Sequence, residues 1–286
     1  MIRANWHTHT EASPNASLRA EDLCDAAEAQ GLTVIGICDH CNYPDARYRD
    51  VMRRSRAAFD RLRPGNPALR FGTELSPCPA GVCAVLRAGK TLPRGRAGYL
   101  APENGSFAPE LALNAEEIDA LGLDYVIAGV HWRCDASDAA VPPDSTAEWI
   151  AEWLRCSVSC AESLSRIAGD RRRILAHPWY SCLTSPWYQT AGDTERRFSV
   201  IPYSAHEELA AALAEYGVCA ECNADQVTHP VLDERYRREY AEFLRFLYES
   251  GVTVTYGSDE SHAYTDRRAG VEAALRKAGF QDGEIQ

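Results

Sequence analysis

The sequence lacks several features that would place the protein in other classes. It has no stretch of about eighteen apolar residues, so no membrane-spanning helix is expected. The first residues, MIRANWHTHT, contain no apolar signal-peptide core, so we expect the protein to remain in the cytoplasm. Lysine occurs only at Lys90 and Lys277, and the formal net charge is −11. This acidic balance disfavours nucleic acid as a partner.

Several well-known catalytic patterns are also absent. No Gly-x-Ser-x-Gly, His-Glu-x-x-His or Walker A pattern is present, so serine-nucleophile, zincin and P-loop chemistry have no support. Two Cys-x-x-Cys spacings occur, at 38–41 and 219–222. Both fall in apolar strand-like runs, where residues three apart point to opposite faces. We therefore do not expect these cysteines to bind metal.

Short apolar runs separated by helical stretches dominate the pattern of the chain. Near-continuous apolar runs bounded by turn signals are typical of strands buried on both faces of a parallel sheet. The runs lie at residues 2–9, 33–40, 69–76, 123–132, 172–179, 217–223 and 251–262. Helical patterns lie at 17–30, from 145 onward, at 204–216, 233–250 and 268–278. This alternation predicts an α/β fold, a closed or nearly closed β/α barrel forming one domain over 1–286. The Pro- and Gly-rich segment at about 77–110 is expected to be a loop or small insertion.

Histidines and carboxylates gather where the predicted strands end. His7 and His9 are two residues apart, so on a strand both imidazoles point to the same face. The other strands end in polar residues at Asp39, His40, Glu74, His131, His177, Glu221, Asn223, Asp259 and His262. Barrel enzymes carry their chemistry at this end of the strands. Because buried imidazoles and carboxylates are costly unless paired or metal-bound, the pattern predicts a multinuclear metal centre.

The types of ligand narrow the choice of metal. Mixed histidine and carboxylate ligands suit zinc, manganese or iron better than calcium or magnesium. We expect two or three divalent ions, which in such centres activate water and clamp an oxyanion. This combination favours hydrolysis, especially of phosphate esters.

These motifs together resemble the polymerase and histidinol phosphatase (PHP) family. They are H-T-H at 7–9, C-D-H at 38–40, G-T-E at 72–74, G-V-H at 129–131, A-H-P at 176–178, E-C-N at 221–223 and G-S-D at 257–259. Their order spans nearly the whole chain. The resemblance implies a distorted (β/α)7 barrel of the PHP type, with a length similar to that of the stand-alone phosphatases.

The resemblance also implies ligand sets. One metal would be held by His7, His9, Glu74 and Asp259. A second would share Glu74 and add His131 and His177, and a third would be held by His40 and His262.

Two departures from the family pattern fall on the third site. Asn15 stands where the family usually has another His or Asp ligand. The last motif is Asp259-Glu260-Ser261-His262, one residue longer than the usual Asp-x-His. A two-metal enzyme, or one with a loosely held third ion, is therefore also open.

Other residues are candidates for the chemistry around the metals. Asp39 is a candidate catalytic carboxylate, or a residue that orients a ligand. Arg133, directly beyond His131, is a candidate for gripping a phosphate bidentately and for catalysis. His229, on a loop before Pro230, is a candidate substrate-binding residue, whereas His206 in the first turn of a helix is expected to face solvent.

The function predicted is that of a metal-dependent phosphoesterase. Its expected partner is a small phosphate ester, hydrolysed by metal-activated water, and the resemblance suggests histidinol phosphate first. Three alternatives remain open: a nucleotide phosphodiesterase or exonuclease-like PHP hydrolase, a non-catalytic metal-binding PHP scaffold, and attack on a C–N bond. The last resembles the amidohydrolase barrels, whose sites usually carry a bridging lysine that neither Lys90 nor Lys277 supplies.

Overall fold

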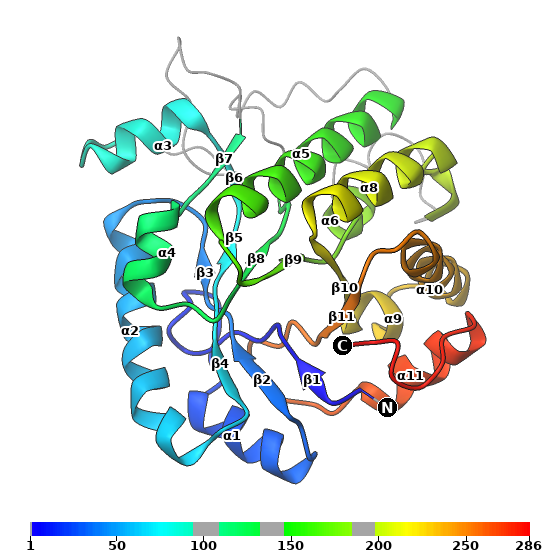
Figure 1. Ribbon diagram of the computed structural model, residues 1–286, viewed down its shortest axis with the longest axis horizontal. Helices are drawn as coiled ribbons and strands as arrows, with labels where there is room; N and C mark the ends of the chain where they lie inside the picture. The colour runs from blue at the N-terminus through cyan, green and yellow to red at the C-terminus, as the bar shows by residue number, and fades with distance from the viewer. Residues whose placement is uncertain (1, 94–108, 132–145, 185–197) are drawn as a thin grey trace.

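The computed structural model describes residues 2–93, 109–131, 146–184 and 198–286. Arg133 lies outside the described residues. The chain has a mixed α/β fold in which helices lie outside a central set of strands (Figure 1). The predicted α/β class with parallel strands is confirmed. None of the helices in the described ranges is both long and apolar enough to cross a membrane.

Most of the described strands form two parallel sheets whose pieces follow the predicted apolar runs. The smaller sheet has the order β1 (Ala4–Asn5), β2 (Val34–Ile37), β4 (Leu69–Phe71). The larger sheet has the order β11 (Val254–Gly257), β10 (Cys219–Asn223), β9 (Arg172–Leu175), β8 (Tyr125–Ala128), β5 (Glu74–Leu75), β3 (His40–Cys41). The parallel pairing places the carboxyl ends of these strands at the same edge, as the sequence pattern requires for a shared site.

Hydrogen bonds connect the two sheets. The Trp6 amide, just after β1, donates to the Tyr256 carbonyl of β11 at 3.0 Å. On the other side, the Asp124 amide, just before β8, donates to the Phe71 carbonyl of β4 at 2.7 Å. The two sheets are also continuous along the chain, since β3 follows β2 and β5 follows β4.

The described part of the segment at 77–110 contains regular structure. Strands β6 (Pro77–Pro79) and β7 (Pro109–Leu111) pair antiparallel, and α3 (Ala80–Arg87) follows β6 directly. This small unit begins immediately after the site strand β5 (Figure 1).

The helices begin and end largely at local signals. Asp45 and Asp233 cap α2 and α10 by accepting a backbone amide, and Asn114 forms a capping box with Glu117 at the start of α4. Most of the other helices lie between consecutive strands, and α11 follows β11, the last of the described strands. The helices are α1 (Ala20–Ala29), α2 (Ala46–Leu62), α4 (Ala115–Leu121), α5 (Thr146–Ile167), α6 (Tyr180–Thr184), α8 (Tyr203–Tyr216), α9 (Ala224–Thr228), α10 (Glu234–Glu249) and α11 (Arg268–Lys277).

His206, on α8, lies among aromatic rings and is not a freely solvated side chain. Its ring centroid is 4.7 Å from that of Phe243 and 5.5 Å from that of Phe198. Burial lowers the pKa of His206 to about 4. The unfolded chain would bind a proton near pH 6.5, so the folded state loses stability as pH falls from about 6.5 towards 4.

We therefore expect a His206→Phe variant to lose part of the acid sensitivity of the metal-free protein. Between pH 7 and 4.5 the wild type should lose about 2–3 kcal/mol more unfolding free energy than the variant. Urea unfolding at both pH values measures the difference, with other titrating groups common to both proteins. Equal losses in the two proteins would show that His206 takes up its proton in the folded state.

Candidate metal centre

Glu74, at the start of β5, lies at the centre of the site and is fully buried. Its Oε1 atom is 3.0 Å from His131 Nε2 and 3.0 Å from His177 Nε2. His131 follows β8, and His177 follows β9. Two imidazoles from neighbouring strands therefore converge on one carboxylate oxygen.

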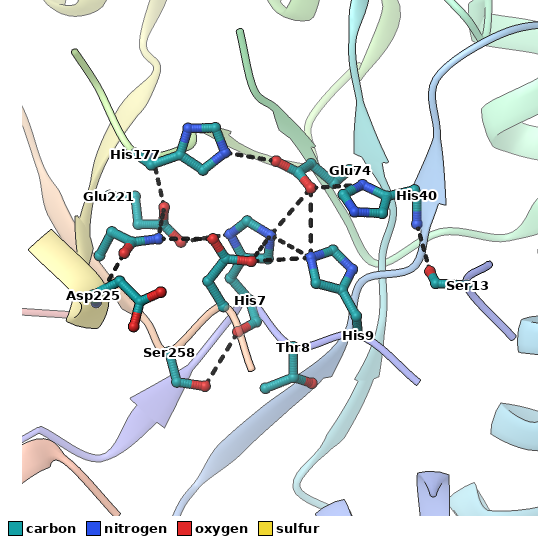
Figure 2. Close-up of polar contacts among 12 residues, drawn as sticks. His7, Thr8, His9, Ser13, His40, Glu74, His177, Glu221, Asp225 and Ser258 are labelled. Carbon is teal, nitrogen blue, oxygen red and sulfur yellow. Dashed lines mark hydrogen bonds and ion pairs between the residues drawn. The ribbon is translucent and has the colours of Figure 1, made fainter. Parts of the chain in front are cut away.

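The other oxygen of Glu74 faces three further imidazoles. Glu74 Oε2 is 2.9 Å from His40 Nδ1, 3.3 Å from His7 Nε2 and 3.5 Å from His9 Nε2. The His9 and His40 rings are stacked with centroids 4.1 Å apart. Figure 2 shows these side chains pointing toward one another around Glu74.

Asp259 lies just after the end of β11 and completes the cluster. Its Oδ1 atom is 3.1 Å from His9 Nε2 and 3.5 Å from His7 Nε2. The backbone of Asp259 has a φ of 55°, and its amide donates to the His7 carbonyl at 2.8 Å. The left-handed conformation is unfavourable for a non-glycine residue, and such strain is concentrated at functional sites.

The donor set fits divalent metal ions. Three groups of ligand atoms each lie within 4.8 Å of one another: His7, His9 and Asp259; His9, His40 and Glu74; Glu74, His131 and His177. Within the described ranges, neither Glu74 Oε2 nor His40 Nδ1 has a hydrogen-bond partner, although the two atoms are 2.9 Å apart. Buried polar atoms without a partner are costly, and a cation between them would remove that cost. Imidazole and carboxylate together suit zinc, manganese or iron.

The electrostatics keep the carboxylates ionised. Burial would raise the pKa of Glu74, but the surrounding imidazoles, His131 first, hold that pKa well below its usual range. Burial would also raise the pKa of Asp259, and the imidazoles of His7 and His9 lower it instead. Ionised carboxylates are the form that binds metal.

The pKa values of the histidines in the centre shift in different directions. Burial would lower the pKa of His7, but Glu221, Asp259 and Glu74 outweigh burial and raise it well above its ordinary value. The pKa of His177 is raised against burial in the same way, chiefly by Glu74. The pKa of His9 is lowered by burial and by the neighbouring imidazole of His40. The centre thus favours positive charge, which a divalent ion would supply.

Glu221 on β10 supports the cluster from behind, although its place at a strand end did not mark it as a ligand. Its Oε1 atom accepts a hydrogen bond from His7 Nδ1 at 2.6 Å. Its Oε2 atom accepts from the His177 amide at 2.6 Å and from Asn223 Nδ2 at 3.2 Å. A carboxylate on Nδ1 leaves His7 Nε2 free to bind a metal. The only signal in the sequence was the Glu-x-Asn spacing at a strand end.

Asn223 joins this support to Asp259. In addition to Glu221, its Nδ2 group donates to Asp259 Oδ2 at 3.1 Å. Asn223 is fully buried. One amide group therefore holds two carboxylates of the centre in fixed positions.

The structure brings seven of the predicted ligands together and places the other candidates elsewhere. The seven are His7, His9, His40, Glu74, His131, His177 and Asp259. His262 is exposed, and its Nδ1 atom is 3.1 Å from Ser17 Oγ. The ligand groups thus place His40 with His9 and Glu74, not with His262.

Asp39 is buried beside the site but points away from its imidazoles. Its two carboxylate oxygens accept hydrogen bonds from the Thr10 amide and from the hydroxyls of Thr10, Ser13 and Ser55, at 2.6–2.8 Å. Ser13 Oγ in turn accepts a bond from the His40 amide at 3.1 Å. Asp39 therefore fixes the turn that follows His9.

His229 caps the end of α9. Its Nδ1 atom accepts a hydrogen bond from the Val231 amide at 3.2 Å. No ligand group found among the described residues includes it.

Gly129, between β8 and His131, has a close-packed neighbourhood that only glycine allows. A Cβ atom there would lie 2.4 Å from Glu74 Oε1 and 2.9 Å from the Cε1 atoms of His131 and His177.

We expect Gly129→Ala to displace the Glu74 carboxylate and to lower zinc affinity by about tenfold or more. Calorimetric titration with zinc tests this, and Gly65→Ala is the control because a Cβ at Gly65 meets nothing within 4 Å. Unchanged zinc affinity in Gly129→Ala would contradict the central place of Glu74.

The family of the chain follows from a sequence comparison. The model of the PHP domain matches residues 5–255, so the chain belongs to the PHP domain family. A search of curated proteins gives no significant match.

Solved structures with a similar fold include a histidinol phosphate phosphatase from Lactococcus lactis, crystallised with zinc, L-histidinol and phosphate. It has a TM-score of 0.58 and 15% identity, and the match covers 98% of this chain and 94% of that one. A multifunctional pyruvate carboxylase from Rhizobium etli matches with a TM-score of 0.43 and 11% identity, over 99% of this chain and 21% of that one. At these identities the likeness concerns the fold alone, and the second match is too weak to carry an argument.

Proposed function

We propose that the protein is a metal-dependent phosphoesterase that hydrolyses a small phosphomonoester. The observation that carries the proposal is the Glu74 carboxylate, which faces two imidazoles on one oxygen and three on the other. Membership of the PHP family and the fold shared with a histidinol phosphate phosphatase support it.

Two ligand groups would hold the ions. His7, His9 and Asp259 would hold one, His131 and His177 the other, and Glu74 would bridge them. When bound, zinc, manganese or iron at such sites supplies a nucleophilic water near neutral pH and neutralises charge on the phosphoryl oxygens. A third ion would have His9, His40 and Glu74 available, and the family pattern adds His262.

The chain's own residues would orient and polarise the reactants. Glu221 fixes the ring of His7, and Asn223 fixes Asp259, so the ligands are preorganised. Arg133 and His229 are our candidates for contacts with the phosphate or the leaving group. For Asp39 we favour a positioning role over a catalytic one, because both of its oxygens are used by Thr10, Ser13 and Ser55.

We further propose that the strands close into the distorted (β/α)7 barrel of a single domain. The bond from the Trp6 amide to Tyr256 and the parallel bridge between Thr8 and Glu260 support closure on one side. The bond from the Asp124 amide to the Phe71 carbonyl supports continuity between the sheets on the other side.

The proposed substrate class is a small phosphate ester with histidinol phosphate as the first candidate. Purified protein would be reconstituted with zinc, manganese or iron and tested for phosphate release. The panel contains histidinol phosphate, nucleoside monophosphates, sugar phosphates and one phosphodiester. We expect turnover of a monoester that is lost in His131→Ala, while Ser157→Ala, a buried serine on α5, retains it.

Other results would select another function. Turnover of the diester alone would contradict the monoesterase and favour the nucleotide phosphodiesterase. Bound metal without release from any compound would contradict an enzyme and favour the metal-binding scaffold.

A further inference from the structure

A chain of polar side chains lies behind His131, on the side of the ring opposite Glu74. Ser76 Oγ is 2.8 Å from His131 Nδ1 and donates to Asn42 Oδ1 at 2.8 Å. Asn42 Nδ2 donates to Tyr48 Oη at 3.3 Å. Ser76 follows β5, Asn42 follows β3, and Tyr48 lies in α2. Ser76 is fully buried, and Tyr48 is buried as well.

The direction of these bonds determines which nitrogen of His131 carries the proton. A serine hydroxyl has one proton, and Ser76 uses it to donate to Asn42. Ser76 can therefore only accept from His131, so the proton of a neutral ring is on Nδ1. The lone pair is then on Nε2, the atom that lies 3.0 Å from Glu74 Oε1 and belongs to the ligand group with His177.

We propose that Ser76 and Asn42 are positioning residues that hold His131 in the tautomer able to bind a divalent ion through Nε2. The proposal rests on the metal centre proposed above, but not on its reaction. An ion bound at Nε2 leaves the ring proton on Nδ1, where Ser76 accepts it. Without Ser76, this Nδ1–H group would lose that acceptor, and affinity for the ion would fall. The contrast with His7 is direct, because a carboxylate accepts from Nδ1 of His7, whereas the neutral Ser76 hydroxyl lies at Nδ1 of His131. The direction of the bonds along the Ser76–Asn42 chain therefore bears on the tautomer of His131.

The opposite direction along the same chain makes different predictions. If Tyr48 donated to Asn42, Asn42 to Ser76 and Ser76 to His131, Tyr48→Phe would remove the first donor. In the direction observed, Tyr48→Phe removes only an acceptor, so we expect little effect. Asn42→Asp keeps the acceptor for Ser76 and cannot donate to it, so it should preserve the tautomer.

The test combines nitrogen NMR of histidine-labelled protein with calorimetric titration by zinc. In the zinc-loaded wild type we expect a hydrogen-bonded Nδ1–H group at His131, with the signal assigned by its loss in His131→Ala. In Ser76→Ala we expect that Nδ1–H signal to shift or to broaden by exchange, and a loss of about 10–100-fold in the affinity of one zinc ion. Asn42→Asp and Tyr48→Phe should resemble the wild type, as should the buried-serine control Ser157→Ala.

Two results would overturn the proposal: no hydrogen-bonded Nδ1–H group at His131 in the zinc-loaded wild type, or a wild-type Nδ1–H signal and wild-type zinc affinity in Ser76→Ala. If Ser76→Ala does not fold, Asn42→Asp and Tyr48→Phe decide, because loss of zinc affinity in both indicates the opposite direction. Phosphate release from the same proteins separates the two proposals. Zinc binding and tautomers as expected without any hydrolysis would contradict only the proposed reaction.

Discussion

Replacing Glu74 by glutamine is expected to release both metal ions and to abolish hydrolysis. A glutamine has one acceptor oxygen, and its amide group would direct N–H bonds toward imidazole nitrogens that now surround a carboxylate. It also removes the negative charge shared by the ligand groups. Losing several kcal/mol of transition-state stabilisation corresponds to roughly a thousandfold lower kcat/KM. Metal content after dialysis, together with phosphate release, measures the effect.

Two matched variants make this result specific. Glu272→Gln carries the same chemical change on α11, where Glu272 accepts a bond from the Ile2 amide, and should retain metal. Glu74→Asp keeps the charge but shortens the side chain, so we expect partial loss. Two bound ions per chain in Glu74→Gln would contradict a bridging role for Glu74.

Glu221→Gln is expected to have the second-largest effect. Glu221 accepts from His7 Nδ1 on one oxygen and from the His177 amide on the other, and a glutamine can accept on only one side. Either His7 loses the partner that fixes its tautomer, or a buried backbone amide loses its acceptor. We expect metal affinity to fall about 10–100-fold. In the metal-free protein the unsatisfied group should lower the unfolding free energy by about 1–3 kcal/mol.

Zinc titration and urea unfolding in the presence of a chelator measure the two effects separately. Glu117→Gln on α4, distant in sequence and in an Arg87 ion pair, is the control for removing a partly buried carboxylate. Lower stability with unchanged zinc affinity would assign Glu221 to folding alone and contradict its role in orienting ligands.

The central residues of the site could be predicted because residues two apart on a strand point to the same face, and because polar residues follow each apolar run. His7 and His9 share a face through their spacing of two, and Glu74 ends a short apolar run. The parallel register then brings such strand ends to one edge of the sheets, which is why seven of the predicted ligands lie together.

The roles of the supporting residues could not be predicted, because their partners are far away in the sequence. Ser76 and His131 are 55 positions apart, and His7 and Glu221 are 214 apart. The environment of His206 depends on Phe198 and Phe243 from other elements, so its place in a helical pattern did not indicate burial. Helix α2 was not predicted, because its many arginines leave only a narrow apolar stripe in the sequence. That buried stripe includes Val51, Met52 and Phe59.

The direction of the His262 side chain also could not be predicted from the spacing of residues. The four residues from Asp259 onward include a left-handed Asp259 and a bridge between Thr8 and Glu260. The amides of Ser17 and Leu18 both donate to the Ser261 carbonyl, which places His262 beside Ser17. Backbone pairing on both sides of this stretch therefore sets the direction of the His262 side chain.

The most direct test of the metal centre is a titration of chelator-treated protein with zinc, followed by measurement of bound metal. We predict at least about two tightly bound ions per chain, with His131→Ala losing one of them and Glu74→Gln losing both. Wild-type protein that binds no zinc, manganese or iron beyond the level of Glu74→Gln would contradict the account.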